Sequence, residues 1–164
     1  MTSQGTLIHL SDADLAWLRG LASAPIADAN DRLAALLGTD GPHTYALEGA
    51  LPGVHHLLVG DGSGLLGFLM DATVGESMAL PLPDTHAHVL LPPTVAAIAD
   101  AIESMSVGPL RLRLEGDALR TLEPFDGRPL EDEDKEWLLA VLQGLMTFMR
   151  RTAKGRVALL VARH

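Results

Sequence analysis

The sequence contains no cysteine, which excludes disulfide bridges and thiolate metal sites. A chain without these stabilising devices fits a reducing cytoplasm. The first five residues, Met1–Gly5, also contain no Lys or Arg, and the acidic segment 11–14 follows within a few residues. Because a signal peptide begins with positive charge and continues into an apolar stretch, we expect no export signal and a cytoplasmic location.

Basic residues are scarce in the first two-thirds of the chain. Residues 1–110 contain twelve acidic and two basic side chains, whereas residues 111–164 contain nine and ten, and the net charge is −9. Nucleic-acid binding depends on Lys and Arg that neutralise phosphates, so no nucleic-acid partner is expected. Two interpretations of the acidic part stay open: a solvated surface that keeps the protein soluble, or a face for a basic protein partner.

No apolar run is long enough to cross a membrane. The most apolar segment, 137–149, is interrupted by Gln143 and Gly144 and is shorter than the roughly 20 residues that a spanning helix needs. With 164 residues, 48% apolar and 20% charged, the chain has the composition of one folded domain. We therefore expect a single domain over residues 1–164 and no membrane association.

The spacing of apolar residues predicts an α+β fold, with a small mixed sheet that includes the N-terminal and C-terminal strands and several helices packed over it. The expected strands are 6–10, 157–162 in the middle of the sheet, and an extended segment 86–90. Residues 65–80 are expected to form irregular or short-strand structure. The expected helices begin after Ser11 and at Pro25, cover 51–59, run from Pro92 to Gly108-Pro109, cover 110–119, and run from Glu131 to Lys154 before Gly155.

Three stretches make the sequence similar to the YfbM-like family of bacterial proteins, over about residues 5–163. The first is Gly53-Val54-His55-His56-Leu57-Leu58-Val59-Gly60, followed by Leu65-Leu66-Gly67-Phe68-Leu69. The second runs from Leu91-Pro92-Pro93-Thr94 to Met105, and the third is the long C-terminal helix with the Gly155 turn and the apolar strand. The family is one of unknown function, so the resemblance implies a fold and names no reaction.

The sequence departs from the family pattern at positions where aromatic residues are common. Leu51 stands where a Trp commonly precedes the histidine helix, and Glu123 stands before Pro124 where an aromatic is common. The segment His86-Ala87-His88 lacks the usual Gly and aromatic residues. A pocket built from those aromatics is therefore not expected in this chain.

His55 is the first candidate for a binding residue because it occupies the histidine position of the family. Histidine titrates near neutral pH, but a lone histidine on an apolar helix more often donates one hydrogen bond to a backbone carbonyl. His56 points about 100° away on the same helix, so the two imidazoles are not expected to share one ion. Asp61, in the glycine-rich loop that follows, is a further weak candidate.

His86 and His88 are the remaining candidates, since alternate residues of a strand project to the same side. With a third ligand such as Asp84 the pair could bind zinc, but no second motif with ligand spacing accompanies it. We expect a solvated edge there, with no metal and no cofactor. The acidic residues 131–136 are expected to cap the long helix.

No catalytic signature is recognised, so the first hypothesis is a non-catalytic module that binds a protein partner. An immunity or antitoxin-like inhibitor is one form of it, because an acidic surface complements a basic active site. The alternative is a small-ligand-binding domain or enzyme with a pocket near His55 and the loop 61–64. The sequence leaves the oligomeric state open.

Overall fold

The structure is a computed structural model that describes residues 4–21, 26–38, 41–60, 64–80 and 85–163, with the backbone alone for 26–30. It confirms the α+β class. The strands are β1 (Gly5–Leu10), β2 (Thr44–Ala46), β3 (Ser77–Leu80), β4 (His86–Leu90) and β5 (Ala158–Arg163). The helices are α1 (Asp12–Gly20), α2 (Ile26–Leu37), α3 (Leu51–Val59), α4 (Pro92–Glu103), α5 (Val107–Glu115) and α6 (Asp132–Gly155), with 3₁₀ helices at Glu48–Ala50, Leu65–Leu69 and Asp117–Thr121.

The five strands form one sheet in the order β2-β1-β5-β4-β3. Every pairing among the described strands is antiparallel, so the expected mixed sheet is corrected in this respect. β5 lies at the centre, as expected from its uninterrupted apolar sequence. In its register with β4, Val161 lies opposite His88 and Arg163 opposite His86.

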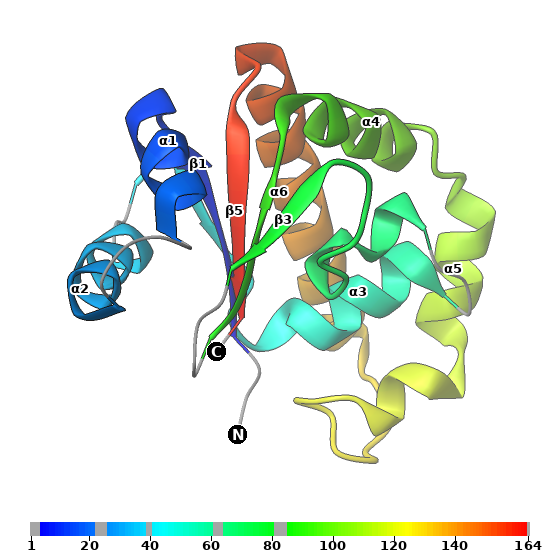
Figure 1. The fold of residues 1–164 in the computed structure, drawn as a ribbon. Helices are drawn as coiled ribbons and strands as arrows, with labels where there is room; N and C mark the ends of the chain where they lie inside the picture. Colours follow the sequence, from blue (N-terminus) through cyan, green and yellow to red (C-terminus); the bar gives the residue numbers. More distant parts are fainter. Residues whose placement is uncertain (1–3, 22–25, 39–40, 61–63, 81–84, 164) are drawn as a thin grey trace.

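Helices cover both faces of the sheet, with α1 and α2 on one side and α3, α4, α5 and α6 on the other (Figure 1). Because strand side chains alternate, Leu160 and Ala162 of β5 face the first side and Leu159 and Val161 the second. The larger core lies on the second side. Arg163 has the same parity as Val161, so its side chain also belongs to that side.

Local signals explain several helix ends. Ser11 caps α1 by accepting a hydrogen bond from Asp14 N at 3.1 Å. At the start of α6, the side chains of Glu131 and Asp134 form a reciprocal capping box, which confirms the capping role of this acidic segment. The expected C′ glycine is corrected: Gly155 is the last helical residue, and Arg156 takes the left-handed conformation, with φ 53°.

The largest departure from expectation lies between α4 and α5. α4 ends at Glu103, and Gly108-Pro109 lies inside the first turn of α5 instead of ending α4. A proline is tolerated there because the first helical N–H groups have no partner within the helix. The expected helix over 110–119 is two pieces, with Gly116 between α5 and a 3₁₀ helix. Among the described helices, none is long and apolar enough to cross a membrane.

Candidate functional site

Four side chains from four segments gather at the end of the sheet where β5 finishes, and we call them the Arg163 cluster. They are His55 of α3, Met70 after the 3₁₀ helix 65–69, His88 of β4 and Arg163 of β5. Figure 1 shows the last residues of β5 beside α3. The cluster therefore forms where the central strands run past the histidine helix.

His88 is fixed by its buried surroundings. It is 1% exposed, so the solvated edge expected for His86 and His88 is wrong at His88. Its Nε2 lies 2.8 Å from the carbonyl oxygen of Phe68. A carbonyl only accepts, so Nε2 carries the proton and donates. Burial lowers the pKa of His88, the bond to Phe68 raises it, and Arg163 lowers it further. His88 is therefore a neutral imidazole that ties β4 to the segment at Phe68.

Arg163 carries a positive charge that has no counter-ion among the described residues. Its Nη1 donates to Met70 Sδ at 3.1 Å, and thioether sulfur is a weak acceptor. Its Nε is buried and has no acceptor among the described residues. No described carboxylate forms an ion pair with it. Burial lowers the pKa of the guanidinium, which indicates that the fold disfavours its charge.

His55 supplies a second unpartnered nitrogen. The ring is half-buried, and Nδ1 is buried with no hydrogen-bond partner in the described part of the chain. Burial, then Arg163, then His56 lower the pKa of His55. The hydrogen bond to a backbone carbonyl that was expected of His55 is found at His88 instead. Buried polar nitrogens are normally satisfied, so two such atoms in neighbouring side chains indicate a place for an acceptor.

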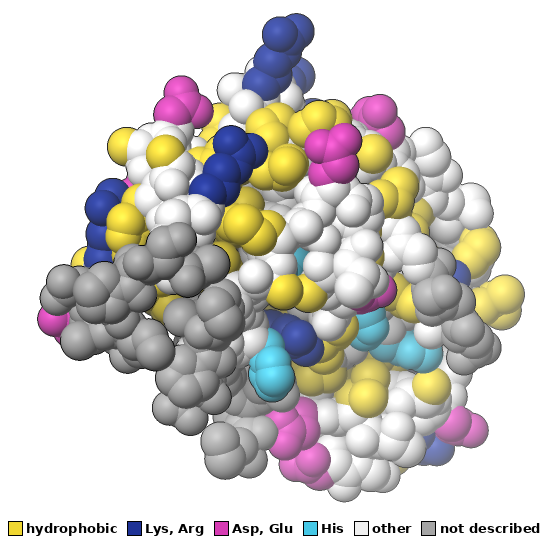
Figure 2. Space-filling model, viewed as in Figure 1, with side chains coloured by type: hydrophobic (Ala, Val, Ile, Leu, Met, Phe, Trp, Pro, Cys, Tyr) yellow, Lys and Arg dark blue, Asp and Glu magenta, His cyan; other side chains and the backbone are white. Residues whose placement is uncertain are grey.

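The electrostatics of the cluster favour an anion. One guanidinium and two neutral imidazoles meet there, and the carboxylate that acts on His88, Asp71, accepts hydrogen bonds from Thr73. Figure 2 shows histidine side chains beside Lys or Arg side chains around a hollow, over the region where Figure 1 places α3 and the end of β5. A carboxylate or phosphate oxygen would satisfy both unpartnered nitrogens and neutralise the charge.

The other predicted residues are distributed differently. His86 lies opposite Arg163 at the start of β4 and is exposed. His56 lines a separate hollow of about 570 Å³ with Gly60 and Arg113, which agrees with the expected divergence of His55 and His56. Asp61 and Asp84 lie outside the described residues. Within the described part of the chain, no group of three His, Cys, Asp or Glu side chains could hold a metal ion.

Arg163 is the residue that sequence reasoning missed. It ends an otherwise apolar run as a single charge before the terminal His164. A lone cation at the end of a central strand is a usable signal, because central strands are buried and arginine is seldom buried without a partner. Its electrostatic effect on His55 depends on the placement of α3 near the end of β5, which local patterns do not encode.

Fold and cluster together define the chain as an α+β domain with a polar site at one end of its sheet. Residues 1–162 match the family described as Domain of unknown function (DUF1877), and the chain belongs to that family. The crystal structure of YfbM from Escherichia coli, a protein of unknown function, is similar with a TM-score of 0.70. The two share 17% identity over 98% of this chain and 99% of that one, which shows the fold alone. No curated protein matches the chain.

Proposed function

We propose that the protein binds a small anionic molecule, a carboxylate or a phosphate, at the Arg163 cluster. The observation that carries this proposal is the half-buried guanidinium of Arg163 without a carboxylate partner among the described residues. A charged side chain that is removed from water is normally paired, because full burial of an unpaired charge costs roughly several kcal/mol. The anion supplies the missing partner.

The geometry gives each residue a role in binding. Nε of Arg163 donates to one anion oxygen, while Nη1 stays on Met70. Nδ1 of His55 donates to the anion as the neutral Nδ1–H tautomer or as imidazolium. A bound negative charge raises the pKa of His55, opposing the effect of burial, so binding is tighter at mildly acidic pH.

Thermal unfolding of the wild type and Arg163→Met tests the proposal. Methionine keeps the length of the side chain and removes its charge, so in anion-poor buffer the variant should unfold at a higher temperature than the wild type. Phosphate or acetate, added at constant ionic strength, should raise the midpoint of the wild type because a ligand bound only by the folded state stabilises it.

Arg19→Met is the matched control, because Arg19 is an exposed helical arginine at the far end of the chain. It should respond to phosphate and acetate as the wild type does, whereas Arg163→Met should not. If all three proteins respond equally, the anions act through solvent and the proposal fails. A direct titration of phosphate by calorimetry gives the same comparison without unfolding.

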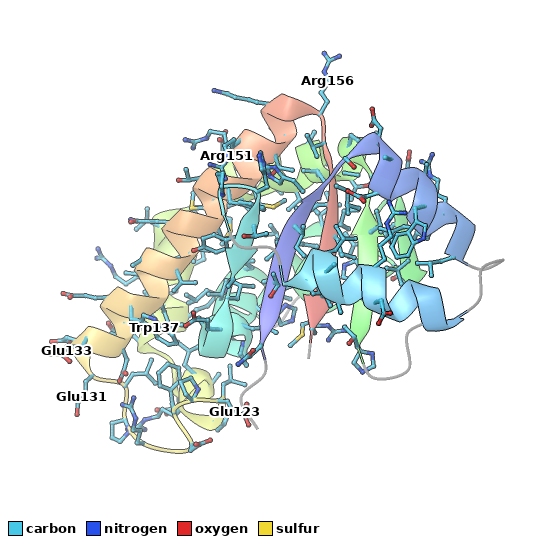
Figure 3. All side chains as sticks on the ribbon, turned by 90° about the vertical axis from the view of Figure 1, so that its left-hand side faces the viewer. Glu123, Glu131, Glu133, Trp137, Arg151 and Arg156 are labelled. Carbon is cyan, nitrogen blue, oxygen red and sulfur yellow. The ribbon has the colours of Figure 1, made fainter. Side chains whose placement is uncertain are left out.

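Trp137 favours a second candidate function, the binding of a basic protein partner. An immunity or antitoxin-like inhibitor would be one form of this function. It is 37% exposed near the start of α6, and Figure 3 shows it at the same end of the helix as Glu131 and Glu133. Tryptophan is enriched among the residues that dominate protein interfaces. The surrounding acids supply the complement of a basic surface.

Affinity purification from the native cells distinguishes specific binding of one partner from non-specific retention by an acidic surface. The tagged wild type should retain one basic protein in stoichiometric amount and release it with salt. Trp137→Ala should lose it, whereas Leu112→Ala should keep it, since Leu112 is 75% exposed on a different helix, α5. Equal retention by Trp137→Ala and the wild type, or no retained protein at all, contradicts this candidate.

A further inference from the structure

An apolar groove lies between α5 and α6, on the far side of α3 from the sheet end that holds the Arg163 cluster. Its volume is about 520 Å³, within the range of small-molecule sites. Buried Ile102, Leu114 and Leu142 line it, together with the half-buried side chains of Leu110 and Met146. We call this cavity the α5–α6 groove.

The groove exists because two apolar helix faces approach without closing on each other. Leu110 and Leu114 of α5 are four residues apart, and Leu142 and Met146 of α6 have the same spacing, so each pair lies on one face. α5 makes its main helix contacts with α3, and its contacts with α6 are sparse. The two faces therefore stay partly uncovered.

The charged side chains that line the groove are Arg111, Glu115 and Lys135, two basic and one acidic. Lys135 Nζ lies 3.1 Å from Glu115 Oε2 and 3.9 Å from Asp132 Oδ1, so its charge is neutralised. Arg111 also lines the groove and is exposed, with no hydrogen bond or ion pair to any described residue. An anionic group above the apolar floor would therefore find a cation with no competing partner among the described residues.

We propose that the α5–α6 groove binds a single-chain amphiphile with an anionic head, such as a medium-chain carboxylate. The apolar chain lies along Leu110, Leu114 and Leu142, and the carboxylate pairs with Arg111 at the rim. Met146 adjusts to the chain, since methionine adapts its shape easily. This site is independent of the anion site at Arg163, because it takes its affinity from apolar burial and uses a different arginine.

Calorimetric titration with monomeric decanoate tests the proposal. Decyltrimethylammonium has the same chain with the opposite charge, and acetate has the head without the chain. The wild type should bind decanoate more tightly than decyltrimethylammonium. Arg111→Gln should weaken decanoate binding by roughly threefold to fivefold, the effect of one exposed ion pair, and leave decyltrimethylammonium binding no weaker.

Two further variants make each outcome decisive. Met146→Gln should weaken binding of both chains, because it makes one wall of the groove polar, while Arg19→Gln should change neither. The absence of decanoate binding by the folded wild type, or equal effects of Arg111→Gln and Arg19→Gln, overturns the proposal. If the protein floats with anionic vesicles but does not bind monomeric decanoate, the groove is a membrane contact, and the proposal is overturned as well. Acetate binding that depends on Arg163 but not on Arg111 concerns the other site alone.

Discussion

Arg163 differs from Arg113 and Arg128, two other arginines of the larger core side, in the groups that its guanidinium contacts. Arg128 forms two hydrogen bonds with Asp134, at 2.6 and 2.7 Å. Arg113 donates to the carbonyl oxygen of Leu57 at 2.6 Å. Within the described part of the chain, the guanidinium of Arg163 has only the sulfur of Met70 as an acceptor. In the proposed function an anion is the missing partner, and binding residues that cost stability without their ligand are an expected trade-off between stability and function.

At the residue scale, the sequence indicates some members of the cluster without showing that they meet. His55 was a candidate from its place in the family pattern, and His88 from its strand spacing. The role of His88 in packing follows from its burial between β5 and the segment at Phe68. The local sequence pattern does not indicate this burial. Arg163 is more than a hundred residues from His55 in sequence, so tertiary structure alone brings them together.

At the element scale, helices with signals at both ends were predicted best. α3 has the expected bounds because Pro52 begins it and Gly60, with φ 59°, ends it. β2 was missed, since a strand of three residues is defined by its pairing with β1 more than by its own sequence. Gly108-Pro109 was misplaced because the pair is as compatible with a helix start as with a helix end.

Gly144 shows how one element is fitted to another. It lies in the interior of α6, where Tyr45 of β2 crosses the helix and donates to the carbonyl oxygen of Val141 at 2.6 Å. A Cβ at this position would lie 3.0 Å from the Tyr45 ring and closer still to its hydroxyl. Glycine therefore permits the contact between β2 and α6, although it weakens a helix.

We predict that Gly144→Ala destabilises the protein by about 1 to 3 kcal/mol, because the overlap exceeds the gain in helix propensity. Urea unfolding measures the change. In a Tyr45→Ala background the overlap is absent, so the same substitution should stabilise the protein by up to about 1 kcal/mol. A loss of equal size in both backgrounds would show that the contact with Tyr45 is not the cause.

At the scale of the whole molecule, the fold keeps several histidines away from water. Burial is the main cause that lowers the pKa of His9, His55 and His88. The folded state therefore favours the neutral form of these imidazoles, whereas the unfolded chain takes up protons near the ordinary histidine pKa of about 6.5. Since the unfolded state binds more protons in this range, stability is full above about pH 6.5 and is lost as pH falls below it.

Carboxylates act in a separate and lower range. Hydrogen bonding from Arg128 lowers the pKa of Asp134 to about 2, so its contribution to stability is present above the ordinary carboxylate pKa of about 4 and is lost as pH falls from there. Both the histidines and Asp134 make the protein less stable as pH falls, but they do so in different pH ranges. Loss of stability between about pH 6.5 and 5 therefore belongs to the histidines.

We predict that the free energy of unfolding falls between pH 7.5 and 5 in buffers free of phosphate and carboxylate, by at most about 1.4 kcal/mol per pH unit for each histidine. His88→Gln should make this dependence shallower, because the amide can donate to Phe68 and does not titrate. His86→Gln, an exposed position on the same strand, is the matched control and should keep the wild-type slope. Urea unfolding at a series of pH values provides the measurement. A slope that is unchanged in His88→Gln would mean that this buried imidazole takes up no proton on unfolding, contrary to the role that its burial gives it.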